Sequence, residues 1–302
     1  MKKLTLIFVV SIWWYSLEAQ VSISTNGATP DPSAILDVKS TNKGLIPPRV
    51  ADTNAILNPA EGTLIYDMSS HGMRYFNGLI WSDCMGNIVP SFRCGDPLVD
   101  VRDSQTYPTV KIGTQCWMAK NLNIGTMVTL NTNQLDNGTL EKYCYGNSTP
   151  NCNVYGGMYQ WNEMMQYVTT AGVKGICPTG WHLPTDAEWC TMEQTLDPSV
   201  TCVSIGERGI DVGGKVKEVG TSHWYAPNTG ATNSSGFTAL GGGFVAGAAN
   251  WDISYIAIFW TSTENSSTKS WRRWPHYSDA KIRRDCDEPK TCGYSVRCVK
   301  DN

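Results

Sequence analysis

Residues 155–189 read YGGMYQWNEMMQYVTTAGVKGICPTGWHLPTDAEW, and they carry the clearest structural signals in the chain. Apolar side chains recur at helical spacing after Gly156-Gly157, with Met158, Trp161 and Met165 on one face. This spacing predicts a helix that begins just after the two glycines and buries one side.

A second helix is predicted at the end of the same stretch. Thr185 and Glu188 have the spacing of a capping box, in which each side chain accepts a hydrogen bond from the backbone N–H of the other residue. Trp189 then opens the inward face, and Asp197-Pro198 ends the helix. These signals predict how the helix packs in a hydrophobic core, and they do not indicate a catalytic or binding site.

Strands are predicted on both sides of the helices. Residues 106–112 and 115–119 flank Gly113-Thr114 and predict a hairpin. Residues 256–260 are apolar and predict a central strand, whereas residues 294–300 alternate, with Arg297 facing solvent. Two helices packed on a small antiparallel sheet with long loops make an α+β domain.

Five motifs follow one another along this part of the chain. They are YGGMYQW (155–161), CPTGWHLPTDAEW (177–189), SGFTALGGG (235–243), FWTSTE (259–264) and SVRCVKD (295–301). Their sequence and order resemble those of the Fibrobacter succinogenes major paralogous domain family, which are secreted bacterial domains of largely unassigned biochemistry. The resemblance covers residues 96–302. The predicted plan also looks like the C-type lectin-like and formylglycine-generating-enzyme-like architecture, by analogy of fold alone.

The N-terminus has the features of a secretory signal peptide. Lys2 and Lys3 precede an apolar run that ends at Leu17, and Ala19 is a small residue suited to cleavage. We expect residues 1–19 to be removed and the mature protein to be exported, without a membrane span, to an extracellular or cell-surface location. Their removal changes the net charge from −3 to −4, a weak acidity that argues against a nucleic-acid binder.

Residues 20–95 are predicted to form a separate β module. ILDVKS (35–40) and GTLIYDM (62–68) read as strands, and Asn77-Gly78 predicts a hairpin turn, which together suggest a small β-meander. Residues 33–67 resemble segments at the head of bacterial surface and tail-fibre-like proteins, where such a module would serve as a spacer or assembly unit. Exposed strand edges would permit a homo-oligomer. The alternative is a plain β domain without an assembly role.

All eleven cysteines follow the signal segment, which predicts disulfides with one thiol left over. Spacing alone does not fix the pairing, and a zinc site is disfavoured because no Cys-x-x-Cys or His-Glu-x-x-His occurs. The preferred pairs are Cys144–Cys152 and Cys286–Cys292 across short loops, Cys190–Cys202 beside the second helix, Cys84–Cys94 at the domain junction, and Cys177–Cys298, which lie in two motifs of the resembled family; Cys116 would remain unpaired.

Candidate ligand-binding residues are mostly aromatic and are expected in loops. Flat aromatic faces beside Asn, Asp and Arg suit sugar rings, which have an apolar face and a rim of hydroxyls. The candidates are Trp224, Tyr225, Trp271, Arg272, Arg273, Trp274 and Tyr277. The alternative is that several of these tryptophans belong to the core.

Calcium is a secondary possibility, because lectin-like folds often bind it through loop oxygens. The candidate ligands are Asn250, Asp252, Glu264 and Asn265. Their spacing is not that of an EF-hand, so no metal site is firmly predicted.

No catalytic residue is predicted. His182 stands beside Asp186 and Glu188, an arrangement that suits a general base, but its place in a tight turn before a capped helix favours a structural role with the ring bonded to nearby backbone. Formylglycine-generating enzymes use two cysteines near their C-terminus to handle copper and oxygen. Cys286 and Cys292 lie near the C-terminus here, but neither their spacing nor their neighbours match that motif.

The sequence therefore favours a secreted or surface-exposed, non-catalytic binding or adhesion protein that recognises extracellular glycan or a surface protein. A structural component of a surface fibre, self-associating through residues 20–95, is the second hypothesis. A cysteine-dependent oxidase is the third.

Overall fold

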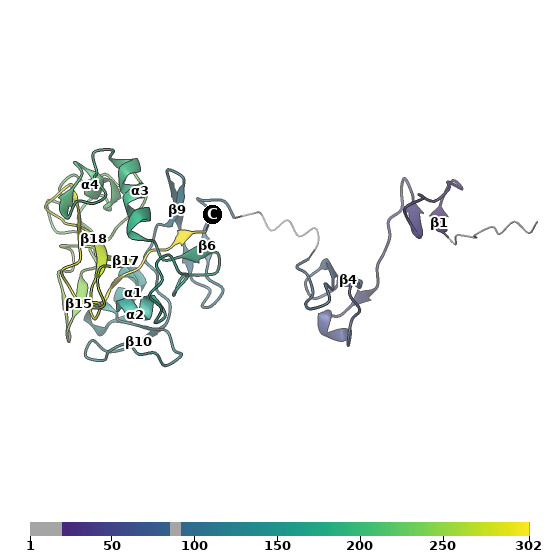
Figure 1. The fold of residues 1–302 in the computed structure, drawn as a ribbon, viewed down its shortest axis with the longest axis horizontal. Coiled ribbons are helices and arrows are strands. Elements are labelled where there is room, and N and C mark those ends of the chain that lie inside the picture. The colour runs from purple at the N-terminus through teal and green to yellow at the C-terminus, as the bar shows by residue number, and fades with distance from the viewer. Residues whose placement is uncertain (1–19, 85–91, 302) are drawn as a thin grey trace, which may run out of the picture. The chain divides into compact units, whose positions relative to one another are not determined.

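The computed structural model describes residues 20–84 and 92–301. The predicted signal peptide, residues 1–19, lies outside the described residues. The chain divides into two compact units, Met1–Val89 and Pro90–Asn302 (Figure 1). None of the helices within the described ranges is long and apolar enough to cross a membrane.

Two small sheets make up the described part of the N-terminal unit. The first pairs β1 (Val21–Ser24) with β2 (Leu36–Lys39), and the second has the order β3 (Arg49–Val50), β4 (Leu64–Asp67), β5 (Gly72–Tyr75), with the 3-10 turn η1 (Thr53–Ala55) between β3 and β4. The predicted meander is wrong, because β1–β2 and β3–β4 are parallel pairs. Parallel neighbours need a crossover between them, whereas a meander has only antiparallel turns.

A turn is present beside β5, but its two central residues are Gly78 and Leu79, one residue later than predicted. The backbone N–H of Asn77 donates to the Ile80 carbonyl at 3.1 Å, and Phe76 and Trp81 form an antiparallel bridge.

The C-terminal unit is mixed α+β and is built on two larger sheets. The six-stranded sheet has the order β12 (Met158–Tyr159), β20 (Tyr294–Ser295), β17 (Phe259–Glu264), β18 (Ser270–Pro275), β19 (Ile282–Asp285), β14 (Gly206–Arg208). The four-stranded sheet has the order β13 (Trp181–His182), β21 (Val299–Lys300), β9 (Gln115–Met118), β8 (Thr109–Ile112). In Figure 1, β17 and β18 run side by side at the centre of the larger sheet.

Shorter elements complete this unit. They are the pairs β6 (Leu98–Val99) with β7 (Thr106–Tyr107), β10 (Thr126–Met127) with β11 (Glu141–Lys142), and β15 (Phe244–Ala246) with β16 (Ala249–Trp251), the helices α1 (Thr149–Tyr155), α2 (Trp161–Met164), α3 (Asp186–Leu196) and α4 (Val212–Val216), and the 3-10 turn η2 (Tyr145–Asn147).

The second predicted helix is confirmed as α3. The backbone N–H of Glu188 donates to Thr185 Oγ1 at 3.1 Å, and the Thr185 N–H donates to Glu188 Oε2 at 2.8 Å. The first predicted helix is wrong at its start. Met158 lies in β12, whose backbone pairs with β20, so the helix begins only at Trp161.

The strand predictions are confirmed in part. β8 and β9 form the predicted hairpin, with Gly113 in the left-handed region at φ 62°. The central strand starts at Phe259 rather than at residue 256. Residues 294–300 form two short strands in different sheets, and Arg297 between them is 1% exposed, so the prediction that it faces solvent is wrong.

Buried ion pairs join α3 to the six-stranded sheet. Glu193 of α3 is fully buried, and it accepts a 2.6 Å hydrogen bond from Nε of the equally buried Arg273 and pairs with Arg208 of β14. Asp186 pairs with Arg273 at 2.7 Å and with Arg284 of β19 at 2.8 Å. Because each of these residues has a partner of opposite sign, the cost of removing its charge from water is offset.

Candidate functional site

Three tyrosines form an aromatic surface on the C-terminal unit. Tyr225 and Tyr255 are 53% and 39% exposed, and their rings stack in near-parallel fashion with centroids 5.0 Å apart. Tyr277 is half-buried and meets both rings edge-on, at 5.4 and 5.1 Å. We call Tyr225, Tyr255 and Tyr277 the tyrosine surface.

Backbone hydrogen bonds hold the three loops that carry these rings. The Tyr225 N–H donates to the Ser254 carbonyl at 2.7 Å, and the Tyr277 N–H donates to the Tyr255 carbonyl at 2.9 Å. The loops are therefore fixed to one another, and the rings keep their relative positions without a ligand.

A buried cation binds two of these three loops, those that carry Tyr225 and Tyr277. Lys217 is fully buried, and its ammonium donates to the carbonyls of Thr229, His276 and Asp279 at 2.8–2.9 Å. Burial lowers the pKa of Lys217 to about 8, while Asp279 acts in the opposite direction, so the amine remains largely protonated at pH 7. All three of its N–H donors are used, which gives Lys217 a positioning role.

Three of the sequence candidates are buried and unavailable to a surface ligand. Trp224 is 1% exposed, and its indole N–H donates to the Ala239 carbonyl at 3.0 Å. Arg272 pairs with Asp285 inside the sheet, and Arg273 belongs to the ion pairs of α3. The prediction that these three residues bind a ligand is therefore wrong. The polar groups of each side chain already have hydrogen-bond or ion-pair partners in the core.

Trp271 and Trp274 are half-buried on β18, and they are not part of the tyrosine surface. The Arg284 guanidinium lies 3.4 Å from the centroid of the Trp271 ring, and Arg283 lies 5.1 Å from that of Trp274. One face of each ring is therefore covered by a cation. Of the sequence candidates, Tyr225 and Tyr277 belong to the tyrosine surface.

The four predicted calcium ligands are engaged elsewhere or scattered. Glu264 pairs with Lys290, and Asn250 Oδ1 accepts a hydrogen bond from the Gly146 N–H at 3.1 Å. Asp252 is exposed near the tyrosine surface, and the backbone of Asn265 bonds Lys269. Among the described residues, no three His, Cys, Asp or Glu side chains gather as metal ligands.

Most of the chain matches sequence models of known families. Residues 110–300 match the sequence model of the Fibrobacter succinogenes major domain. The chain belongs to the Fibrobacter succinogenes major domain family. The resemblance seen in the five motifs is thereby confirmed, although the match does not show a lectin-like or formylglycine-generating-enzyme-like fold.

Residues 22–95 match a second model, described as a phage tail-like trimerisation region. This agrees with the tail-fibre-like resemblance of the N-terminal segment. Neither the curated proteins nor the solved structures contain a significant match to this chain.

Four disulfides fasten the family domain and the residues just before it. They are Cys94–Cys116, Cys144–Cys152, Cys177–Cys298 and Cys190–Cys202. The last three were predicted and are confirmed. Such a number of disulfides fits an extracellular or exported protein, because thiols remain reduced in the cytosol.

The pair Cys84–Cys94 and the unpaired state of Cys116 were predicted wrongly. Thr109 Oγ1 accepts from the Gly95 N–H at 2.9 Å and donates to the Asp96 carbonyl at 2.7 Å. These bonds hold the segment that contains Cys94 against β8, beside its hairpin partner β9, where Cys116 lies. Cys84 is free within the N-terminal unit, where its Sγ lies 3.1 Å from Ser70 Oγ.

The predicted pair Cys286–Cys292 is also wrong, and both residues are free thiols. Cys292 packs in the main hydrophobic cluster, whereas Cys286 follows β19 at a half-buried position, so the two side chains lie in different surroundings. Burial raises the pKa of both thiols, and nearby carboxylates raise that of Cys286 further. A raised pKa disfavours the thiolate, which is the form that binds metal and attacks substrates.

His182, in the family domain, lies between two carboxylates. Its Nδ1 lies 2.7 Å from Asp301 Oδ1 and its Nε2 lies 2.7 Å from Glu188 Oε1. The structural role was predicted, but the partners are carboxylates and not backbone groups. The hydrogen bond with Glu188 is the largest of the effects that raise the pKa of His182.

Tyr255 is the residue of the tyrosine surface that sequence reasoning missed. It directly precedes the apolar run of residues 256–260, and no signal in the sequence marked it as an exposed residue. Only the strand's late start, at Phe259, leaves Tyr255 in an exposed turn.

Proposed function

We propose that this protein is a secreted or cell-surface, non-catalytic binding protein that recognises extracellular glycan through the tyrosine surface. The exposed, stacked pair Tyr225–Tyr255 carries the proposal. Sugar rings present an apolar face of C–H groups, and they pack on flat aromatic faces that are held in place. Fixed rings lose little conformational entropy when a ligand binds.

Two polar residues next to members of the tyrosine surface, Asp252 and His276, suit the hydroxyl rim of a sugar. Asp252 is exposed three residues before Tyr255. His276 lies beside Tyr277 with ring centroids 4.6 Å apart. These groups offer donors and acceptors at the edge of an apolar platform, which is the usual composition of a small-molecule site.

The test is binding of the mature chain to a panel of insoluble polysaccharides and soluble glycans. We expect saturable binding that weakens by at least about tenfold in Tyr225→Ala and Tyr255→Ala, since truncated aromatic anchors commonly lose 1.4 kcal/mol or more. Trp251→Ala is the matched control, because Trp251 is an exposed aromatic residue on β16 outside the tyrosine surface.

Binding that falls equally in Trp251→Ala, or no binding to any glycan in the panel, would contradict the proposal. A chelator is included in each assay. Because Glu264 and Asn250 are already engaged, we expect it to have no effect.

A second candidate function is that of a structural component of a surface fibre. The match of residues 22–95 to a trimerisation region supports it. Self-association and glycan binding are compatible, because they involve different units of the chain. In the purely structural alternative, the mature chain trimerises but binds no glycan.

A further inference from the structure

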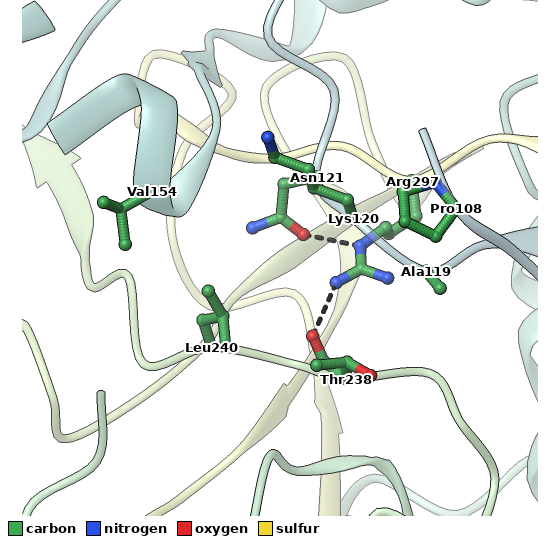
Figure 2. A pocket seen from close by; sticks show the side chains of 8 residues that line it. All are labelled: Pro108, Ala119, Lys120, Asn121, Val154, Thr238, Leu240 and Arg297. Carbon is green, nitrogen blue, oxygen red and sulfur yellow. Dashed lines mark hydrogen bonds between the residues drawn. The ribbon is translucent and has the colours of Figure 1, made fainter. Parts of the chain in front are cut away.

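A cavity of about 220 Å³ lies in the C-terminal unit, and none of its lining residues belongs to the tyrosine surface. Its walls come from five separate parts of the chain: the residue between β7 and β8, the segment after β9, the end of α1, the loop before β15, and the link between β20 and β21. The lining residues are Pro108, Ala119, Lys120, Asn121, Val154, Thr238, Leu240 and Arg297 (Figure 2).

Arg297 is the main polar group of this cavity, and it is held rigidly. Its Nε donates to Asn121 Oδ1 at 2.5 Å, and its Nη1 donates to the carbonyls of Met118 and Phe237 at 2.8 and 2.7 Å. Its Nη2 donates to the Thr238 carbonyl at 3.0 Å. Figure 2 shows Arg297 between Asn121 and Thr238. Four of the five N–H donors of a guanidinium are thus used, and one on Nη2 remains.

The charge of Arg297 has no counter-ion among the described residues. Every hydrogen-bond partner given above is a neutral oxygen, and the acidic residues of the described chain form no ion pair with it. The guanidinium carbon also lies 4.4 and 5.6 Å from the ring centroids of Phe237 and Phe259, but these rings carry no formal negative charge. Other buried arginines of the same unit, such as Arg273 and Arg208, each pair with Glu193. Burial alone lowers the pKa of Arg297 to about 9, so the guanidinium is still charged at pH 7. An uncompensated buried charge is costly, and a bound anion would relieve it.

Lys120 adds a second positive charge to the lining. It is half-buried, and within the described ranges it enters no hydrogen bond or ion pair. The lining therefore contains two cations and no carboxylate, while Pro108, Ala119, Val154 and Leu240 make the rest of it largely apolar.

We propose that this cavity binds a small molecule with a carboxylate and an apolar body. The carboxylate would accept hydrogen bonds from the remaining Nη2 N–H of Arg297 and from the Lys120 ammonium, and the apolar walls would contact the body. A phosphate fits less well, because its additional charge and oxygens call for more donors than these two groups supply. The proposal is independent of glycan binding at the tyrosine surface.

The test is ligand-observed saturation-transfer NMR on the mature chain at neutral pH. The probes are butyrate, N-acetylalanine and inorganic phosphate, and butyramide is the uncharged match for butyrate. We expect butyrate to bind and butyramide not to bind. If N-acetylalanine binds about tenfold more tightly than butyrate, the source of the carboxylate is a peptide C-terminus, and otherwise it is a free acid.

Variants locate the site. Lys120→Gln should weaken butyrate binding about tenfold, the loss typical of one charged hydrogen bond, whereas Lys111→Gln, at an exposed position of β8 outside the cavity, should leave it unchanged. Leu240→Trp fills the cavity and should abolish binding. Val154→Trp also fills the cavity. Because Val154 is 41% exposed, this variant should fold even if Leu240→Trp does not, and it then replaces Leu240→Trp in the test.

The proposal is overturned if butyramide binds as well as butyrate, if only phosphate binds, or if butyrate binding survives in a folded cavity-filling variant. Absence of any carboxylate signal at millimolar probe concentrations also overturns it.

Discussion

At the scale of single residues, His182 gives the protein a defined pH dependence. Its ring lies between Glu188 and Asp301, both of which favour the charged imidazolium and raise its pKa above the usual 6.5. The stabilisation is fully present below the unfolded pKa near 6.5, and it is lost as pH rises through the higher pKa of the folded state. We expect it to amount to about 1 kcal/mol, because the ring and both carboxylates are partly exposed and water screens them.

The measurement is urea unfolding of the wild type and of His182→Gln at about pH 5.5 and about pH 8.5. The variant should lose more unfolding free energy at the lower pH. His276→Gln is a control of opposite sign, since burial and Lys217 lower the pKa of His276. An equal loss at both pH values for His182→Gln would show that the imidazolium contributes nothing.

Single residues also show which features could be predicted from the sequence and which could not. The capping box of Thr185 and Glu188 could be predicted because it depends on only four consecutive residues. The burial of Arg297 could not, since it depends on the chain leaving one sheet after Ser295 and joining another at Val299. Strict alternation assumes a single continuous strand, and here that assumption fails.

At the scale of elements, the Cys177–Cys298 disulfide joins the turn before β13 to the residue directly before the last strand, β21. The two cysteines are 121 residues apart in the sequence, and both are buried. A cross-link that closes a long loop restricts the unfolded chain more than one that closes a short loop. Replacing both by alanine should therefore reduce the unfolding free energy by about 5 kcal/mol.

The matched control is the double alanine variant of Cys144 and Cys152, which are 8 residues apart. The same relation gives a loss of about 2.5 kcal/mol for this shorter loop. Chemical unfolding of the two variants under non-reducing conditions measures both values. Equal losses would mean that native packing around the sulfurs, and not loop length, governs the stabilisation.

Elements also explain which disulfides the sequence revealed. Cys144–Cys152 and Cys190–Cys202 are close in sequence, so loop length suggested them. Cys94–Cys116 requires knowledge that β8 places the segment around Cys94 beside β9. The tyrosine surface has the same character, since it is assembled from three loops that only the tertiary fold brings together.

At the scale of the whole molecule, we predict that the mature chain is a homotrimer held together by residues 22–95. The match of this segment to a trimerisation region motivates the prediction. Light scattering coupled to size exclusion should give three times the monomer mass for the mature chain and the monomer mass for a chain that begins at residue 92. The prediction fails if both chains are monomers or both are trimers.

A trimer would present three tyrosine surfaces to one polymeric ligand. Binding at the second and third surfaces is then intramolecular, which raises the overall affinity by about a hundredfold or more when the spacing of the ligand permits it. The truncated chain should therefore bind soluble oligosaccharides as the mature chain does, while losing most of its affinity for insoluble polysaccharide.

The Cys94–Cys116 disulfide has a mechanical consequence. If the N-terminal segment is fixed to an assembly and the tyrosine surface holds a glycan, tension runs along the backbone and enters the C-terminal unit near residue 92. Two residues later, at Cys94, the disulfide transfers this force directly to Cys116 near the start of β9. The hydrogen bonds of residues 95–115 are thereby bypassed, and the domain resists being peeled open from its point of attachment.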